Sequence, residues 1–435
     1  MFERPLPEDL ERHLLTSEDC LQKGDLPGAL AASTRSLLIN SSDFRALALS
    51  GLALAQMGEL EKGVSHLKAA LKGAGENPDM LFNLGLALKE LGNADESVEV
   101  YHRALKAAPD MAPAAFNLGN ILHEKGAFKE AEEAYCQALK AEPEMVGAKH
   151  NLAQTLQKAG RRAEAILLYL AYIVNNPNDA DAHYNLAVSL HQEGRYEEAS
   201  RAYRSALAID PSNEAARHLC IALAGENSDS PPDSYVLGLF DAYAEQYEKH
   251  LIENLGYCVP EAIQALVAEA SDNRRFSRGL DLGCGTGLIG DAFGDRVDRL
   301  VGVDLSNNML EAARQKSIYH ALHHGNLVDF LEGVQAYDLV LAADAFNYVG
   351  ALNEVFHRTA RCLEPSGYFA FSVENVAGDG FKLLPSGRYG HSQFYIENLA
   401  SENGLNVVAG KLVSIRKERG KAIAGTLFVL RKPNK

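Results

Sequence analysis

The chain has 435 residues, of which 47% are hydrophobic, and a formal net charge of −16. This length predicts two or three domains, the hydrophobic content excludes wholesale disorder, and an acidic chain without a long basic run is not expected to bind nucleic acid. No stretch approaches the roughly 18 apolar residues of a membrane span, and MFERPLPEDLERHLL lacks the pattern of a signal peptide. The six cysteines are scattered without a CxxC pair, so we expect reduced thiols in a cytoplasmic protein and no metal site.

The first half of the chain repeats one unit. Residues 10–213 align as six rows of 34 residues without an insertion. One column is glycine in every row, which predicts the left-handed residue that ends a helix: Gly24, Gly58, Gly92, Gly126, Gly160 and Gly194. A second column holds small residues, which let two antiparallel helices approach closely: Ala29, Gly63, Ser97, Ala131, Ala165 and Ala199. A third is proline in the last four rows, where it stops the second helix: Pro109, Pro143, Pro177 and Pro211.

This register resembles the tetratricopeptide repeat, although the chain has no tryptophan and Ser41 and Gly75 replace the proline in the first two rows. The resemblance implies an all-α superhelix of helix pairs that serves as an interaction surface. Residues 213–225, NEAARHLCIALAG, are expected to form a capping helix over the last apolar face. We therefore expect a tetratricopeptide-repeat domain over residues 1–224.

A further column holds an asparagine in four consecutive repeats: Asn83, Asn117, Asn151 and Asn185. Stacked repeats would line these amides along the concave surface, where each can donate to and accept from an extended peptide backbone. That arrangement resembles the asparagine ladders with which some tetratricopeptide superhelices hold peptides, and it predicts a protein or peptide partner. Alternatively, each asparagine only bonds the neighbouring repeat.

The sequence changes character after residues 225–234, GENSDSPPDS, whose Ser, Asp and Pro predict a linker. Strand candidates then alternate with helical patterns: strands over 278–283, 299–305, 337–344 and 367–374, and helices over 287–294, 307–317 and 351–364. The alternation predicts an α/β doubly wound (Rossmann-like) domain over residues 235–435, with a parallel sheet and helices on both faces. Residues 406–432 contain two strand patterns joined by a charged turn, which predicts a C-terminal antiparallel hairpin.

The stretch LDLGCGTGLIG, residues 280–290, follows the first strand and opens a helix, at the sheet edge where open α/β folds bind ligands. A parallel sheet closed by an antiparallel hairpin resembles the class I methyltransferases, whose cofactor S-adenosyl-L-methionine carries an ammonium group and no phosphate. Asp281 suits that ammonium better than the pyrophosphate expected from the GxGxxG match at 285–290. The loop residues expected at the cofactor are Asp281, Gly283, Cys284, Gly285 and Gly287.

The same resemblance assigns further cofactor contacts to the end of the second strand. Asp304 at its tip would accept hydrogen bonds from both ribose hydroxyls, with Leu305 beside it. Met309 would pack on the adenine, or alternatively belong to a helix core.

Two later loops complete the expected site. Asn326, followed by Leu327, stands where the family usually has an acid, and its carbonyl would accept the adenine amino group. Asp344 and Asn347, after the strand over 337–344, would lie beside the transferable methyl group.

Four segments of the second half occur together in this chain: residues 240–257, the glycine loop, residues 338–350 and residues 386–396. Together they resemble bacterial predicted methyltransferases that carry tetratricopeptide repeats in the same chain. The resemblance implies that Tyr243 and Tyr247 fold over the cofactor; alternatively, this helix face only packs on the domain.

Methyl transfer from a sulfonium is an in-line displacement, so the main contribution of the protein is alignment. An oxygen or ammonium acceptor can need a general base, and His391 and His250 are the catalytic candidates because imidazole titrates near neutral pH. Arg388 and Tyr389 share the SGRYGH segment with His391, and Arg388 could pair with an acceptor carboxylate. Alternatively the segment is an ordinary loop. Glu374, at the end of a strand, is a weaker candidate.

Three functional hypotheses stay open at this point. The first is an S-adenosylmethionine-dependent methyltransferase acting on a protein or peptide that the repeats recruit. The second is a methyltransferase for a small molecule, with repeats that mediate dimerisation or docking to a partner. The third is a non-catalytic repeat adaptor, against which the intact glycine loop and Asp304 argue.

Overall fold

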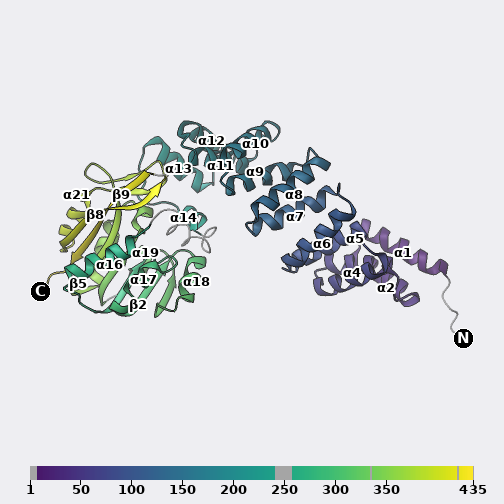
Figure 1. Ribbon diagram of the computed structural model, residues 1–435, viewed down its shortest axis with the longest axis horizontal. Coiled ribbons are helices and arrows are strands. Elements are labelled where there is room, and N and C mark those ends of the chain that lie inside the picture. The colour runs from purple at the N-terminus through teal and green to yellow at the C-terminus, as the bar shows by residue number, and fades with distance from the viewer. Residues whose placement is uncertain (1–6, 241–256, 334–335, 419–420, 435) are drawn as a thin grey trace. The chain divides into compact units, whose positions relative to one another are not determined.

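The computed structural model describes residues 7–240, 257–333, 336–418 and 421–434. The chain forms two compact units, residues 1–195 and 196–435 (Figure 1). The first unit is all-helical and the second holds an α/β sheet domain, which confirms the predicted fold class. The expected domain limits at residues 224 and 235 stay a prediction. Within the described ranges, no helix is both long and apolar enough to cross a membrane.

The first unit is built of helix pairs (Figure 1). Its helices are α1 (Pro7–Gln22), α2 (Leu26–Ile39), α3 (Phe44–Gln56), α4 (Leu60–Ala74), α5 (Pro78–Glu90), α6 (Ala94–Ala107), α7 (Ala112–Glu124), α8 (Phe128–Ala141), α9 (Val146–Lys158), α10 (Arg162–Asn175) and α11 (Ala180–Gln192). The glycines of the repeat have the predicted left-handed backbone; Gly92 and Gly126, for example, have φ of 81° and 73°. Helices α6, α8 and α10 end two residues before the proline of their row, as predicted.

Small residues bring the two helices of a pair into close contact. Ala131 and Ala165 of the predicted small-residue column are fully buried. A Cβ atom on Gly85 in α5 would lie 2.7 Å from the ring of Tyr101 in α6, and Tyr101 is itself buried. The repeat therefore packs an aromatic ring of its second helix directly on the backbone of its first.

The second unit begins with α12 (Tyr196–Ile209) and α13 (Glu214–Ala224), and α13 covers the residues predicted as a capping helix. Asn213 caps α13, because its Oδ1 accepts the N–H of Ala216 at 2.8 Å. The helices that follow are α14 (Asp233–Phe240), α16 (Val259–Ala270), α17 (Leu288–Phe293), α18 (Asn307–Gln315), α19 (Leu327–Phe330), α20 (Asn353–Cys362) and α21 (Gln393–Glu402), with short 3₁₀ turns η2 (Gly294–Arg296) and η3 (Phe346–Tyr348).

The strands of the second unit form one sheet. They are β1 (Phe276–Leu282), β2 (Val297–Asp304), β3 (Ala321–His324), β4 (Tyr337–Ala342), β5 (Leu363–Asn375), β6 (Phe381–Leu383), β7 (Tyr389–His391), β8 (Asn406–Glu418) and β9 (Lys421–Arg431). The main path is β3-β2-β1-β4-β5-β9-β8, parallel from β3 to β5. Strand β9 is antiparallel to β5, and β8 and β9 form the predicted C-terminal hairpin. The small β6–β7 hairpin joins the end of β5 through β7.

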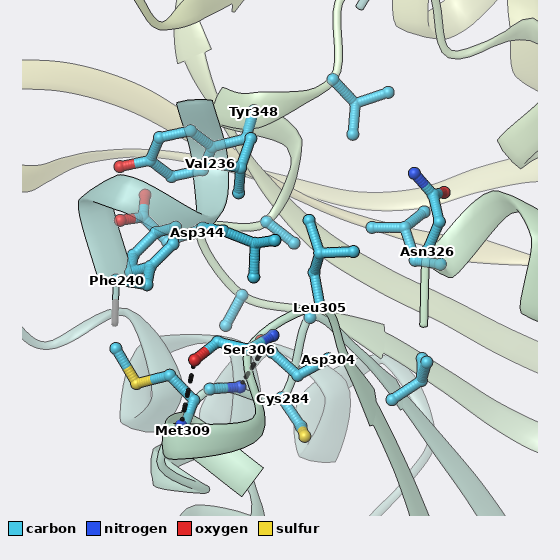
Figure 2. Close-up of a pocket in the computed structure, with 18 of the residues that line it drawn as sticks. Val236, Phe240, Cys284, Asp304, Leu305, Ser306, Met309, Asn326, Asp344 and Tyr348 are labelled. Atoms are coloured by element: carbon cyan, nitrogen blue, oxygen red, sulfur yellow. Dashed lines mark hydrogen bonds between the residues drawn. The ribbon is translucent and has the colours of Figure 1, made fainter. Parts of the chain in front are cut away.

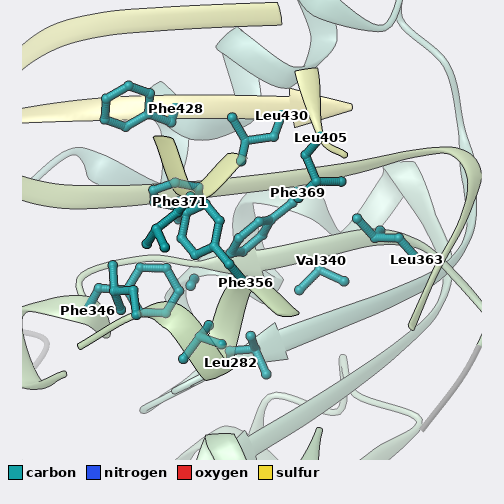
Figure 3. Close-up of a cluster of buried hydrophobic side chains, with 14 of the residues drawn as sticks. Leu282, Val340, Phe346, Phe356, Leu363, Phe369, Phe371, Leu405, Phe428 and Leu430 are labelled. Atoms are coloured by element: carbon teal, nitrogen blue, oxygen red, sulfur yellow. The ribbon is translucent and has the colours of Figure 1, made fainter. Parts of the chain in front are cut away.

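Side chains of the central strands alternate between two hydrophobic clusters, one on each face of the sheet. Val340 belongs to the cluster with α20 and α21, and Leu339 to the cluster with α16 and α17. Figure 3 shows the first cluster, in which Phe369 and Phe371 of β5 lie close to Phe356 of α20. This double-sided burial holds the strand ends that carry the site.

The residues predicted as a linker are hydrogen-bonded to the sheet domain. Asn227 Nδ2 donates to the carbonyl of Phe381 at 3.0 Å, and its Oδ1 accepts the N–H of Leu383 at 2.8 Å. The hydroxyl groups of Ser228 and Tyr389 lie 2.7 Å apart. All three partners belong to the β6–β7 hairpin, so this segment of chain is fixed along one edge of the domain.

Candidate cofactor site

A cavity of about 1230 Å³, open mouth included, lies at the carboxyl ends of β1, β2 and β4. The loops that follow β1, β2, β3 and β4 all contribute to its wall (Figure 2). The remaining wall comes from residues 230–240, which include α14, and from Tyr257 and Pro260 at the start of α16. Open α/β folds bind their ligands at this edge of the sheet, so the cavity is the candidate site.

The glycine loop after β1 fits closely against the neighbouring loop. Gly283 has φ of 69°, and a Cβ atom there would lie 2.7 Å from the Cβ of Ala345. Gly285 lines the cavity with open space where a Cβ would stand, so a ligand can reach the backbone there. Cys284 also lines the cavity, whereas Gly287 caps α17 outside the lining.

Asp304 connects the end of β2 to the glycine loop. Its Oδ2 accepts the N–H of Gly285 at 2.8 Å, and its Oδ1 accepts the N–H of Ser306 at 2.9 Å. Burial raises the pKa of Asp304, and these backbone hydrogen bonds oppose that effect. A carboxylate has about four lone-pair sites, so Asp304 keeps acceptor capacity for a hydroxyl group in the cavity beside its backbone hydrogen bonds.

Asp281 lies outside the cavity lining. It is fully buried, and the hydroxyl of Tyr319 donates to its Oδ2 at 2.6 Å. Among the described residues, its Oδ1 has no hydrogen-bond partner. Burial raises the pKa of Asp281 to about 7, and the bond from Tyr319 opposes the rise. The predicted contact with an ammonium group stays a hypothesis, since here the carboxyl packs against Tyr319.

The residues predicted at the adenine line the cavity: Leu305, Met309, Asn326 and Leu327. Met309 is buried in the first turn of α18, so it is at once part of the cavity wall and of the helix packing. Asn326 caps α19, because its Oδ1 accepts the N–H of Val328 at 2.9 Å, and its Nδ2 donates to Asp233 at 3.3 Å. Its carbonyl oxygen has a second lone pair for a ligand.

Asp344 lines the cavity just beyond β4. Its φ of 58° is left-handed, a conformation that non-glycine residues adopt at a cost and often at functional sites. The Nδ2 of Asn347 donates to Asp344 Oδ1, and Asn347 itself is 1% exposed. The structure thus places Asp344 on the cavity wall and Asn347 behind it.

The residues predicted for catalysis in the SGRYGH segment do not line the cavity. His391 is fully buried in β7, its Nε2 donates to a backbone carbonyl at 2.9 Å, and burial lowers its pKa to about 4. Tyr389 is also fully buried. Arg388 Nε donates to the hydroxyl of Tyr348 at 3.0 Å, and its Nη1 pairs with Glu418. The catalytic roles of Arg388, Tyr389 and His391 stay hypotheses, because none of the three side chains lines the cavity.

Three predicted site residues, Tyr243, Tyr247 and His250, lie outside the described residues. Glu374, at the end of β5, is buried and accepts a 2.5 Å hydrogen bond from Arg416 of β8.

Sequence reasoning missed Arg416, Tyr348 and the whole wall from residues 230–240. A signal for that wall was present, because two prolines precede the apolar stretch YVLGLF and proline is common at helix starts.

The asparagine column of the first unit makes two different contacts. Asn151 Nδ2 donates to Asn120 Oδ1 at 2.8 Å, which joins α9 to α7 of the preceding repeat. Asn117 Nδ2 donates to the carbonyl of Pro113 in its own helix at 2.9 Å. Asn151 therefore makes the bond to the neighbouring repeat that the alternative describes, while Asn117 leaves its carbonyl oxygen unused by these bonds. The predicted groove, which also includes Asn83 and Asn185, stays a proposal.

Two family models match the chain. One, described as methyltransferase domain, matches residues 280–371, and the other, described as tetratricopeptide repeat, matches residues 48–112, 82–145 and 150–214. The chain combines tetratricopeptide repeats with a class I methyltransferase domain. Methyltransferases of this class use S-adenosyl-L-methionine.

Curated relatives match the methyltransferase part. The ubiquinone biosynthesis O-methyltransferase of Klebsiella pneumoniae is 26% identical over 148 residues, 29% of this chain and 60% of that enzyme. The malonyl-[acyl-carrier protein] O-methyltransferase of Salmonella typhimurium is 29% identical over 142 residues, 32% of this chain and 53% of that enzyme. The chain thus spans little more than half the length of these relatives.

Among solved structures, the alignment with YrrB, a TPR protein with an unusual peptide-binding site, covers 43% of this chain and 96% of the YrrB chain. The two are 22% identical, with a TM-score of 0.41.

The cavity of the methyltransferase domain fits a nucleoside with an amino-acid tail. Its wall offers the carboxylate of Asp304 for sugar hydroxyls and the bare backbone at Gly285. The hydroxyl of Thr286, buried in the same loop and on the cavity wall, has no hydrogen-bond partner among the described residues. An orphaned buried hydroxyl is costly, and a bound ligand with polar groups would satisfy it.

Proposed function

We propose that this protein transfers a methyl group from S-adenosyl-L-methionine to a protein or peptide that the repeats recruit. The observation that carries the proposal is Asp304, which ties the glycine loop to the end of β2 and presents its carboxylate to the cavity. The cofactor supplies a sulfonium with a transferable methyl group. The chain binds and orients this donor, and Asp344 on the cavity wall lies next to the expected path of the acceptor.

The repeats support recruitment of a macromolecule. Repeat arrays of this kind act mainly as interaction surfaces, and the asparagine column offers a row of amides in four repeats: Asn83, Asn117, Asn151 and Asn185. The six cysteines are all free thiols, which agrees with the reducing cytoplasm that we propose as its location.

A second candidate function follows from the relatives, which are named as O-methyltransferases of ubiquinone biosynthesis and of a malonyl group on a carrier protein. In this alternative the acceptor is a small molecule, free or carried by a protein, and the repeats mediate docking to that protein or dimerisation. A non-catalytic adaptor is the third alternative, and failure to bind the cofactor would favour it.

Calorimetric titration with S-adenosylmethionine tests the donor site. Asp304→Ala should weaken binding at least about 100-fold, because charge-assisted hydrogen bonds contribute roughly 1.5–3 kcal/mol each. Asp298 of β2 is an exposed carboxylate that pairs with Arg275 and does not line the cavity. Asp298→Asn is therefore the matched control and should bind S-adenosylmethionine as the wild-type chain does. Unchanged affinity of Asp304→Ala would contradict the proposed donor site.

The acceptor is tested by incubating the full chain with methyl-labelled cofactor and lysate. A labelled protein or peptide supports the first candidate, and a labelled small molecule supports the second. Replacing all four column asparagines by alanine should reduce labelling of a protein acceptor and leave cofactor affinity unchanged.

A further inference from the structure

Charged side chains behind the cavity form a series of contacts that connects two residues of the cavity wall, Tyr348 and Asp344. Arg416 of β8, only 2% exposed, donates from Nη2 to Glu374 at 2.5 Å and from Nε to Glu418 at 3.1 Å. Glu418 also pairs with Arg388, whose Nε donates to the hydroxyl of Tyr348 at 3.0 Å. Tyr348 lines the cavity, and these contacts fix its phenol oxygen from behind.

Asp344 is the other end of this series of contacts. Arg416 Nη1 lies 3.8 Å from Asp344 Oδ1, and the Nδ2 of Asn347 donates to the same oxygen. Within the described part of the chain, no group donates a hydrogen bond to Oδ2 of Asp344. The carboxylate is therefore held through one oxygen and has the other available on the cavity wall.

Tyr348 is held in the complementary way. Its phenol oxygen accepts from Arg388, and the guanidinium carbon of Arg388 lies 5.8 Å from the ring centroid. Among the described residues, nothing accepts the hydroxyl hydrogen of Tyr348. The ring of Phe240 meets the ring of Tyr348 edge-on, with centroids 5.0 Å apart. Figure 2 draws the carboxylate of Asp344 beside these two rings.

This part of the wall, Asp344 with Tyr348 and Phe240, thus offers one hydrogen-bond acceptor and one donor next to two aromatic rings. A hydroxyl group satisfies both, since it donates to the carboxylate and accepts from the phenol. A carboxylate ligand does not, because Asp344 would repel it while the nearby guanidinium groups of Arg388 and Arg416 are already paired with Glu418 and Glu374.

We propose that this wall is the acceptor subsite and that it takes a hydroxyl group on an aromatic ring, as in a tyrosine side chain or a small phenol. The inference rests on the proposed function. The rings of Phe240 and Tyr348 suit an aromatic ligand, because aromatic pairs gain beyond simple burial. A phenol has a pKa of about 10, so a carboxylate can remove its proton during transfer far more readily than that of an alkyl alcohol.

The proposed transfer is a direct displacement. The phenol oxygen attacks the methyl carbon, the bond from carbon to sulfur breaks, and sulfur keeps the electron pair as a thioether. The hydroxyl proton passes to Asp344 Oδ2 and from there to solvent. The products are an aryl methyl ether, S-adenosylhomocysteine and one proton.

The subsite predicts which ligands bind the full chain loaded with S-adenosylhomocysteine. The probes are 4-ethylphenol, its methyl ether 4-ethylanisole, and 4-ethylbenzoate, each titrated by ligand-observed NMR. The phenol should bind at least tenfold more tightly than the other two. Asp344→Asn and Tyr348→Phe should each weaken phenol binding about tenfold and change the affinity for S-adenosylhomocysteine less than twofold. Asp298→Asn should change neither.

The outcomes separate this inference from the proposed function. If the wild-type chain does not bind S-adenosylhomocysteine, the proposed function fails and the inference falls with it. If it binds this product but no phenol, or the benzoate as tightly as the phenol, only the acceptor subsite is overturned. Loss of S-adenosylhomocysteine affinity in Asp344→Asn would make Asp344 a cofactor residue and also overturn the subsite. Tyr348→Phe keeps the ring, so it tests the donor even where Asp344→Asn disturbs the fold.

Discussion

His218 Nε2 donates a 3.0 Å hydrogen bond to the carbonyl oxygen of Gly387, which lies 169 residues further along the chain. His218 belongs to α13, the predicted capping helix, and Gly387 precedes β7 of the methyltransferase domain. Around this bond, Ala222 of α13 packs with Leu383 and Tyr389 of the β6–β7 hairpin. The predicted capping helix is therefore packed as a structural part of the methyltransferase domain.

This shared helix predicts where the chain can be shortened. Deletion of residues 1–195 keeps α13 and should leave affinity for S-adenosylhomocysteine unchanged within twofold. Deletion of residues 1–224 removes α13, uncovers Leu383 and Tyr389, and should cost about 3 kcal/mol or more, because a fully buried apolar side chain contributes roughly 1.5–3 kcal/mol. Urea unfolding and calorimetry compare the two products, and equal stability would show that α13 is dispensable.

Substitution of Gly387 by alanine should destabilise the fold more than the same substitution at Gly404, because only Gly387 lies against another side chain. It has φ of 77°, and a Cβ atom there would lie 2.3 Å from the hydroxyl oxygen of Tyr235. Gly404 has φ of 68° with open space around it. Gly404→Ala should cost roughly 1–2 kcal/mol for the backbone alone, and Gly387→Ala at least about 1–3 kcal/mol more for the clash. Urea unfolding measures both, and equal costs would mean that Tyr235 moves freely.

His391 should make stability fall in acid. Its pKa is lowered by burial from about 6.5 in the unfolded chain to about 4 in the fold. The neutral imidazole therefore contributes stability that is present above about pH 6.5 and is lost as pH falls towards 4, by roughly 2–3 kcal/mol between pH 7 and 4.5. His391→Gln keeps a donor and does not titrate, so its unfolding free energy should fall less over this range. Parallel pH profiles for the two proteins would contradict the assignment.

The asparagine column predicts different effects for two neighbouring members. Asn151→Ala removes the bond to Asn120 in the preceding repeat and should cost about 1 kcal/mol. Asn117→Ala removes only a bond within its own helix at an exposed site and should cost less than about 0.5 kcal/mol. Urea unfolding followed by circular dichroism compares them, and the reverse order would show that the inter-repeat bond is not stabilising.

The elements that sequence predicted well are those whose reason is local and repeated. The left-handed glycines such as Gly92, the proline stops and the alternating strands each follow from backbone geometry over a few residues. The glycine loop and Asp304 were found because a sharp strand-to-helix turn and an acid at a strand tip are visible in a short stretch.

What the sequence could not provide were contacts between distant segments. Arg416 and Glu374 are 42 residues apart and meet only because β9 brings β8 into the same sheet. The polar sequence around His391 is typical of an exposed loop, yet β7 pairs with β5 and buries the imidazole. Residues 225–234 were taken for a linker because their hydrogen bonds reach partners about 150 residues away, as Asn227 does with Phe381.

Strand β9 lies between β5 and β8, so the sheet stays incomplete until residue 431 has been synthesised. Domains fold as units during synthesis, the N-terminal ones first. The repeats are then able to fold on a ribosome that has not yet finished the methyltransferase domain. Under the proposed function, an acceptor protein bound by the repeats at that stage would be in place before the methyltransferase domain is complete.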